Sequence, residues 1–243
     1  MFKYHNKIEK NSILLLVLTL IVISVGGIVE IVPLFRLETT IEKVEGIRPY
    51  SPLELLGSKI YKREGCYSCH SQQVRVLNDE VERYGHYSLA AESMYDYPFQ
   101  WGSKRTGPDL ARIGNKYSDE WHRAHLNNPR SVVFGSIMPR YSFLEKKEAK
   151  LIDIAKDMRA LKILGVPYSE EMIQNSYSDA VVQATNEGES DGIKRRYGDK
   201  INIRDFDGNP YKISEMDALI SYLQIIGTFV DFQKYEKFEN QNQ

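Results

Sequence analysis

Residues 66–70 read Cys66-Tyr67-Ser68-Cys69-His70, and this stretch decides how the rest of the chain is interpreted. Two cysteines three positions apart, with a histidine directly after the second, form the attachment motif of a c-type haem. Each thiol adds across one vinyl group of the porphyrin, so the two sulfurs must lie about one helical turn apart on one face. The histidine then lies under the ring and can bind the iron. The motif therefore predicts a haem c attached to Cys66 and Cys69, with His70 as the proximal iron ligand.

The two cysteines, which are the only ones in the chain, have three alternative interpretations. A zinc site needs four ligands, and no second Cys-x-x-Cys or histidine pair follows at the spacing of a zinc finger. A thioredoxin-like redox pair requires the motif to close a strand and open a helix, whereas residues 53–64 before it have a helical pattern. A structural disulfide between residues three apart is uncommon. Covalent haem attachment is the preferred interpretation.

The length and charge of the chain restrict the kind of protein it can be. It has 243 residues and a formal net charge of −1. This length suffices for one or two domains with a buried core. Because the charge is close to zero, the chain has no basic field that would attract nucleic acid, and we expect no nucleic-acid partner.

The first forty residues differ in composition from the remainder. From Asn11 to Val29 the chain is uncharged and rich in Ile, Leu and Val, and its length approaches the roughly 20 residues that cross a hydrocarbon core. A cleaved signal peptide is the alternative, but its apolar region is usually only about 7–15 residues long and ends at an A-x-A-like site, which is missing here. Lys3, Lys7 and Lys10 precede the apolar run, which predicts a retained anchor in the membrane lipid with a cytoplasmic N-terminus.

The expected fold is mainly α-helical, with one transmembrane helix ahead of a haem domain. We expect a cytoplasmic N-terminus at residues 1–11, an anchor at 12–35 and a linker or strap at 36–52. The haem domain is expected at residues 53–230 and a C-terminal tail at 231–243.

Capping residues and apolar spacing predict four helices in the haem domain. These cover residues 53–64 after the cap Ser51, residues 119–128 after Ser118, residues 145–164 before Gly165, and residues 215–227 after Ser214. Residues 183–200 are polar and are expected to form an exposed excursion. Residues 201–204 and 211–213 are predicted to form a small β-hairpin. Asp205 and Asp207 lie between them at a spacing that differs from a calcium-binding EF-hand loop, so we interpret them as a turn.

An iron bound by His70 needs a second axial ligand to act purely as an electron carrier. Met138 is the candidate, because it lies in a loop-like segment ahead of Pro139, 68 residues after His70. A methionine thioether raises the reduction potential relative to a second histidine. Met158 and Met216 fit apolar helix faces and are expected to be core residues, and Met94 is a weaker candidate.

Other histidines offer an alternative to Met138. His86, His122 and His125 are possible distal ligands, and His122 and His125 share one helix face. Without a third ligand at suitable spacing, we interpret them as surface or interface residues. Pro108 has a possible second role, because the other ring N–H of a proximal histidine usually donates to a fixed acceptor. A backbone carbonyl at Pro108 could be that acceptor, and an ordinary turn is the equal alternative.

Taken together, these elements resemble the class I cytochrome c domain: a helix, the Cys-x-x-Cys-His motif, Gly107-Pro108-Asp109-Leu110, a Met-Pro loop and a C-terminal helix. This resemblance implies that the first and last helices of the domain cross near the haem edge. Gly57 and Tyr61 would then meet residues 219–222. The resemblance also implies that the Pro108 carbonyl accepts a hydrogen bond from His70.

A narrower resemblance runs from Glu82 to Met138. The strings Arg83-Tyr84-Gly85-His86-Tyr87-Ser88, Trp101-Gly102-Ser103-Lys104-Arg105-Thr106-Gly107-Pro108-Asp109-Leu110, Asp119-Glu120-Trp121-His122 and Asn128-Pro129-Arg130 resemble the mono-haem subunit II of cbb3-type cytochrome c oxidases. The likeness covers about residues 10–165 and returns at residues 216–227. Residues 183–213 depart from it as an insertion before the last helix.

The second resemblance implies an electron-transfer subunit. Such a subunit takes electrons from a di-haem cytochrome c subunit or another c-type donor and passes them to haem b of the catalytic haem–copper subunit I, which reduces oxygen. It implies that Trp101 and Arg105 belong to a haem-binding wall facing that subunit, and that a calcium ion lies near the interface with no ligands assignable here. It also implies an inner-membrane protein with one span and a periplasmic haem domain.

Three other functions stay open at this point. The anchor-plus-cytochrome plan is shared by the cytochrome subunit of nitric oxide reductases. A haem-based gas sensor or a peroxidase would need an open sixth position at the iron. An assembly protein would hold a purely structural haem.

Overall fold

The computed structural model describes residues 5–34, 41–42, 44–100, 104–188 and 190–235. The chain forms two compact units, Met1–Glu42 and Lys43–Gln243. Each unit is described by itself below.

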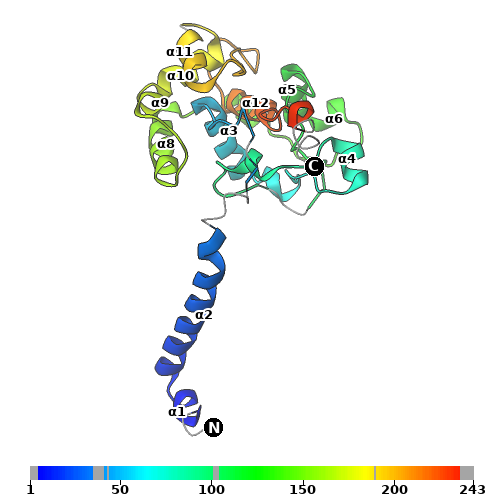
Figure 1. The fold of residues 1–243 in the computed structure, drawn as a ribbon. Helices are drawn as coiled ribbons and strands as arrows, with labels where there is room; N and C mark the ends of the chain where they lie inside the picture. The colour runs from blue at the N-terminus through cyan, green and yellow to red at the C-terminus, as the bar shows by residue number, and fades with distance from the viewer. Residues whose placement is uncertain (1–4, 35–40, 43, 101–103, 189, 236–243) are drawn as a thin grey trace. The chain divides into compact units, whose positions relative to one another are not determined.

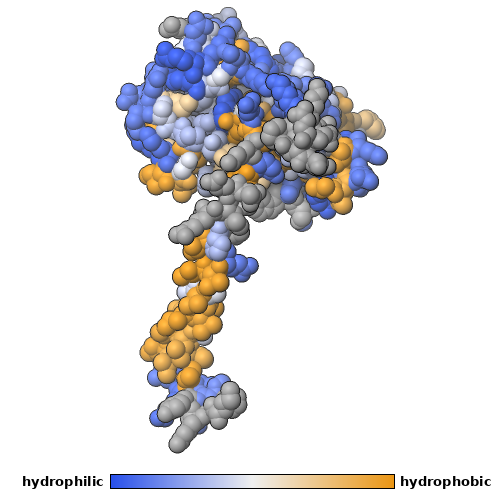
Figure 2. Space-filling model, in the orientation of Figure 1, coloured by the Kyte–Doolittle hydropathy of each residue, from blue (hydrophilic) through white to orange (hydrophobic). Residues whose placement is uncertain are grey.

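The first unit contains helices α1 (His5–Glu9) and α2 (Ser12–Leu34). Within the described residues, one segment, Ser12–Pro33 of α2, is long and apolar enough to cross a membrane, and none of it is buried by the protein. Figure 2 shows hydrophobic side chains covering α2 along its length. The helix coincides with the anchor expected at residues 12–35, as far as that range is described.

The second unit is helical, as Figure 1 shows. Its α-helices are α3 (Pro52–Arg63), α4 (Asn78–Tyr84), α5 (Asp119–Asn127), α6 (Pro129–Val132), α7 (Phe143–Lys146), α8 (Ile154–Ile163), α9 (Glu170–Gln174), α10 (Ser176–Thr185), α11 (Ser190–Tyr197) and α12 (Glu215–Ile225), and its 3-10 turns are η1 (Cys66–Ser68), η2 (Ala90–Ser93) and η3 (Leu151–Asp153). No strand occurs among the described residues, where the β-structure is a single bridge between Glu148 and Ser214. The expectation of a mainly α fold is confirmed.

Helices α3 and α12 form the centre of the core and pack on each other more extensively than any other pair of elements. Every residue of α12 is buried, and the two helices cross in the middle of the unit (Figure 1). A Cβ atom on Gly57 would lie 1.9 Å from the carbonyl oxygen of Ala218 and 2.6 Å from Cβ of Tyr222. The rings of Tyr61 and Tyr222 pack with their centroids 5.6 Å apart. The expected contact of Gly57 and Tyr61 with residues 219–222 is thus confirmed, and the missing side chain at Gly57 allows the close approach.

The start of α3 is held by a capping box at Ser51, the residue that the sequence predicts as the cap. Ser51 Oγ accepts from the backbone N–H of Glu54, and the Glu54 carboxylate accepts from the backbone N–H of Ser51. The Arg48 guanidinium donates to both Glu54 oxygens at 2.7 and 2.9 Å. Glu54 is 1% exposed, so its charge is buried together with a bidentate partner, which offsets the cost of burial.

The helix predicted over residues 145–164 is wrong at its first half. The structure has the short helix α7, an extended Lys147 and then α8, which begins at Ile154. The backbone of this segment pairs with the residues before α12: Ala149 N donates to Ile213 O and Glu215 N donates to Lys147 O, at 3.0 and 2.8 Å. These long-range hydrogen bonds replace the helical ones, because tertiary pairing overrides local helix propensity. The predicted end of the helix is confirmed by the positive φ of Gly165.

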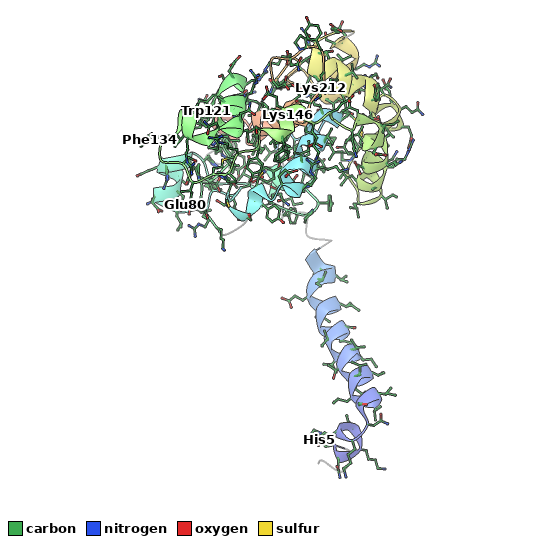
Figure 3. All side chains as sticks on the ribbon, turned by 180° about the vertical axis from the view of Figure 1, so that it is seen from behind. His5, Glu80, Trp121, Phe134, Lys146 and Lys212 are labelled. Carbon is green, nitrogen blue, oxygen red and sulfur yellow. The ribbon has the colours of Figure 1, made fainter. Side chains whose placement is uncertain are left out.

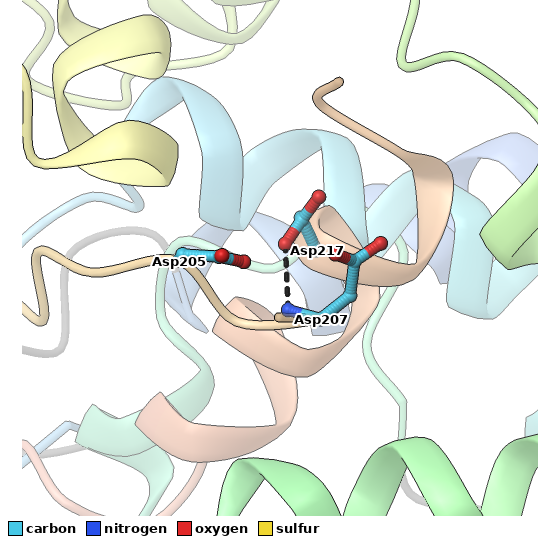
Figure 4. A group of neighbouring side chains, drawn as sticks. All are labelled: Asp205, Asp207 and Asp217. Carbon is cyan, nitrogen blue, oxygen red and sulfur yellow. Dashed lines mark hydrogen bonds between the residues drawn. The ribbon is translucent and has the colours of Figure 1, made fainter. Parts of the chain in front are cut away.

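The β-hairpin predicted from residues 201–204 and 211–213 is also wrong. Its second arm pairs with Ala149 instead, and the turn between the arms is held by carboxylates. Asp205 Oδ1 accepts from the backbone of Gly208, and Asp217 Oδ1 accepts from the N–H of Asp207 at 2.9 Å, the bond drawn in Figure 4. The expected exposed excursion at 183–200 is wrong as well, because Gln183, Ile193 and Tyr197 are buried and α10 packs against α3.

Candidate haem-binding site

The attachment motif lies in a tight turn directly after α3. Gly65 ends the helix with φ +71°, and η1 follows it. The backbone N–H groups of Cys69 and His70 both donate to the carbonyl of Cys66, at 3.1 and 2.9 Å. The two thiols are not joined in a disulfide. The turn therefore keeps the cysteines one turn apart with His70 next to them, which is the arrangement that two thioether bonds and an axial imidazole require.

The His70 imidazole is oriented by the Gly107-Pro108 turn. Its Nδ1 lies 2.8 Å from the carbonyl oxygen of Pro108. A carbonyl only accepts, so Nδ1 carries the proton and the lone pair on Nε2 is left for a metal. A Cβ atom on Gly107 would lie 2.3 Å from Cε1 and 2.8 Å from Nε2 of His70. The glycine thus forms a cradle that only a residue without a side chain can provide.

Asp109 clamps the Gly107-Pro108 turn onto the segment after the motif. Its carboxylate accepts from Ser71 Oγ at 2.6 Å and from the backbone of Gln73 and Ala111 at 2.9 and 2.8 Å. The main chain adds a bond from Gly107 N to Cys69 O, also 2.9 Å long. Ser71 and Asp109 are buried, so water does not compete for these bonds. They keep the Pro108 carbonyl at a constant distance from the imidazole.

Arg105 belongs to the same clamp. Its guanidinium donates to Ser71 Oγ and to Glu80 Oε2, both at 2.7 Å, and to the carbonyl of Gln73 at 2.9 Å. The hydrogen bond from Arg105 holds the pKa of Glu80 well below its usual range although burial opposes this. All three acceptors belong to the protein, and these contacts brace the loop behind His70.

The segment that carries Met138 closes on the last turn of α5. Tyr141 N donates to Leu126 O at 2.8 Å, and Met138 N donates to Ser136 Oγ at 3.2 Å. Met138 is partly buried and packs on the core. Burial and the nearby Cys66 and Cys69 raise the pKa of Tyr141, so this segment and the attachment motif border one region. Met158 and Met216 are fully buried core residues, as expected.

The loop before Met138 exposes a group of apolar side chains. Val132, Val133, Phe134 and Ile137 are all exposed, Phe134 by 96%. Figure 3 shows Phe134 projecting outward at the edge of this unit. We call these four residues the apolar loop.

The remaining histidines occupy two different places. His86 stacks on Phe232 of the C-terminal segment, with ring centroids 4.2 Å apart. It does not belong to the attachment motif in the sequence. His122 is buried, and burial lowers its pKa to about 4. Burial, followed by the charge of His70, lowers the pKa of His125. His125 is therefore close enough to His70 for their charges to interact, which the sequence did not indicate.

Two expectations for this region concern other residues. Trp101 lies outside the described residues, so its place in the expected wall is not described. One carboxylate oxygen from each of Asp205, Asp207 and Asp217 lies within 4.8 Å of the other two. Figure 4 shows the three side chains close together. Asp217 accepts from the backbone of Phe206, Asp207 and Ser214, and Asp207 Oδ2 accepts from Ser214 Oγ. These bonds close the loop before α12, in agreement with the turn expected there.

The sequence analysis assigned no role in the site to four residues: Ser71, Glu80, Gly107 and Asp109. The only available signal was the glycine directly before Pro108. The clamp joins residues about 36 positions apart, and no local pattern reports such a contact.

Comparison with known protein families identifies the family of the chain. No curated protein matches the chain at a significant level. A family model described as cytochrome c oxidase, mono-haem subunit/FixO, matches residues 5–230, which include both helices of the first unit, the attachment motif, the Met138 segment and α12. This match confirms the resemblance to the mono-haem subunit of cbb3-type oxidases. The chain belongs to the FixO family of mono-haem cytochrome c oxidase subunits.

Proposed function

We propose that this chain is the electron-transfer subunit of a cbb3-type oxidase, carrying one haem c. It takes electrons from a di-haem cytochrome c subunit or another c-type donor and passes them to haem b of catalytic subunit I. The observation that carries the proposal is the bond from His70 Nδ1 to the Pro108 carbonyl directly after the Cys66–Cys69 turn. The family implies a haem c, and the cradle at Gly107 fits an imidazole that is held rigidly for a metal.

In the proposed site Cys66 and Cys69 would hold the porphyrin, and His70 and Met138 would bind its iron. Haem c, when bound, supplies an iron that takes up and releases one electron. The Pro108 carbonyl holds the proton on His70 Nδ1, which strengthens Nε2 as a donor and prevents rotation of the ring. The Met138 thioether favours ferrous iron and so raises the potential. Arg105 braces the loop behind His70. Trp101 is proposed to extend the expected wall of Trp101 and Arg105 towards the catalytic subunit.

The apolar loop is the proposed contact for a redox partner. It directly precedes Met138, and Phe134 has almost no contact with the rest of the unit. Apolar groups exposed together on a surface mark an interaction site, because their burial is favourable. A partner bound there approaches the edge of the site rather than its buried clamp.

We also propose the orientation of the chain in the membrane. The family and the apolar α2 support a single anchor in the lipid of the inner membrane. Lys3, Lys7 and Lys10 on the N-terminal side of α2 support a cytoplasmic N-terminus by the positive-inside rule. The haem domain is then periplasmic, where c-type haem is attached.

A test of the function uses the purified membrane complex that contains this chain. We expect its haem c to be reduced by a c-type cytochrome and reoxidised when oxygen is admitted, and a copper-containing catalytic subunit to copurify. A haem c that stays reduced in the presence of oxygen would refute the proposal. Carbon monoxide binding to the reduced haem c would favour a gas sensor instead.

Replacing Cys66 with alanine should leave one thioether bond instead of two. We expect the pyridine haemochrome absorption to move to the position of a haem with one free vinyl group, because the remaining vinyl extends the conjugated system. The measurement is the haemochrome spectrum of the full chain after maturation in its native host. A spectrum identical to that of the wild type would contradict attachment at Cys66, and Ser68→Ala serves as the control inside the same turn.

Replacing Met138 with alanine should open one axial position and lower the potential. We expect the reduced protein to bind carbon monoxide, and the charge-transfer band between methionine sulfur and ferric iron to disappear. Optical spectra and a redox titration measure both effects. Met94→Ala is the matched control, since Met94 is the weaker candidate from the sequence. If the band survives in Met138→Ala and is lost in Met94→Ala, the ligand assignment is wrong.

A further inference from the structure

The last turn of α5 presents a buried histidine nitrogen that the protein does not use. Within the described part of the chain, His125 Nδ1 is one of a small set of buried side-chain polar atoms without a hydrogen-bond partner. A buried ring nitrogen without a partner has lost its hydrogen bonds to water without replacement, which is unfavourable. Such a group is retained when a ligand supplies the missing partner, so its surroundings indicate what that ligand is.

The His125 ring stacks on one aromatic side chain, which is itself held by a second. Trp121 stacks on His125 with centroids 4.7 Å apart and an interplanar angle of 12°. Tyr117 in turn stacks on Trp121, with ring centroids 4.0 Å apart and an interplanar angle of 15°. Stacking from one side fixes the plane of the imidazole. The ring therefore cannot easily turn its unused nitrogen towards another protein group.

The last turn of α5, which carries His125, lies near the proposed haem site. The charge of His70 contributes, after burial, to the lowered pKa of His125, which places the two imidazoles near each other. The segment from Met138 to Tyr141 joins the same turn of α5 through the bond from Tyr141 N to Leu126 O. His70 and the Met138 segment come from distant parts of the chain, and the last turn of α5 lies near both.

We propose that His125 is a positioning residue on the Met138 side of the haem, whose Nδ1–H donates a hydrogen bond to the Met138 thioether. This inference rests on the proposed function, because it requires a haem with Met138 as ligand. A thioether sulfur is a weak acceptor. A hydrogen bond to it withdraws electron density from sulfur, which weakens its donation to ferric iron more than to ferrous iron. The bond thus raises the potential beyond the effect of methionine alone.

Two substitutions separate the hydrogen bond from the packing. His125→Phe keeps an aromatic ring against Trp121 and removes the N–H, whereas His125→Asn gives up the stack but keeps an N–H donor at the position of Nδ1. We expect His125→Phe to change the relative affinity of ferric and ferrous iron for the ligand about tenfold, which lowers the midpoint potential by about 59 mV. We expect His125→Asn to stay close to the wild type. The charge-transfer band should shift in His125→Phe and remain visible.

The measurements are a redox titration and optical spectra of the haem c in the purified complex, with His122→Phe as the control. His122 lies one turn earlier in α5 and is also a buried histidine with an unpartnered nitrogen, so its replacement tests burial without the proposed bond. An unchanged potential and band in His125→Phe would overturn the proposal. So would an equal fall of the potential in His122→Phe, or a fall in His125→Asn with none in His125→Phe. A wild-type protein without any methionine–iron band would instead refute the ligand assignment in the proposed function.

Discussion

Replacing Gly57 with alanine should destabilise the haem domain by about 3 kcal/mol, the upper part of the range for inserting atoms into a packed core. The added Cβ would lie 1.9 Å from the Ala218 carbonyl oxygen, which is main chain and cannot rotate away. The helices α3 and α12 must then separate, and the buried contacts along all of α12 loosen with them. For a unit of this size, such a loss lowers the melting temperature by about 6–12 °C.

The measurement is thermal unfolding of the purified full chain followed by circular dichroism. Gly135→Ala is the matched control, because a Cβ atom there meets nothing within 4 Å and its φ is not positive. We expect the control to melt within about 2 °C of the wild type. Equal melting temperatures for Gly57→Ala and Gly135→Ala would show that the crossing can widen at no cost, and would contradict the close approach.

Replacing Gly107 with valine should displace the His70 ring and remove it as a stable axial ligand. A Cβ atom at this position would overlap three ring atoms, at 2.3, 2.7 and 2.8 Å. The ring must then rotate away from the Pro108 carbonyl and lose the bond that orients it. Losing an outer-shell partner of this kind typically weakens metal binding 10–100-fold, and here the imidazole is displaced as well.

Two readouts distinguish loss of the ligand from loss of the fold. We expect Gly107→Val to keep a covalently attached haem, because the cysteines are untouched, but to bind carbon monoxide and to lose the spectrum of a six-coordinate low-spin haem. Pro108→Ala is the control, since it retains the backbone carbonyl that accepts from His70. A low-spin spectrum in Gly107→Val, with the potential of the wild type, would show that the cradle is not required.

The haem attachment and the central helices could be predicted from the sequence because their signals are local. Cys66, Cys69 and His70 fall within one turn, and the caps Ser51 and Ser214 stand directly before α3 and α12. A capping residue and an apolar stripe act over a few positions, which is the range that a sequence pattern reports. The crossing at Gly57 was predictable only through the resemblance to class I cytochromes c.

Errors arose where contacts between distant segments decide the local conformation. Residues 147–149 have helical spacing but pair with residues 213–215, and residues 201–213 have alternating apolar residues but are closed by Asp205 and Asp217. In both places a long-range hydrogen bond supplies the backbone partner that the predicted helix or hairpin would have supplied. Local helix or strand propensity contributes too little free energy per residue to outweigh these long-range hydrogen bonds.

The sequence by itself predicted the cofactor, the anchor and the family, since each prediction depends on residues that are neighbours in the chain. Only the tertiary structure decided what surrounds His70 and Met138, the proposed iron ligands. The structure decided between the two expectations for Pro108, whose carbonyl lies next to His70 from 38 residues further along the chain. The Asp109 clamp spans 38 residues as well, and the unused nitrogen of His125 belongs to α5. Their roles follow from distances in space and from burial, which arise only when α3, α5 and α12 have packed together.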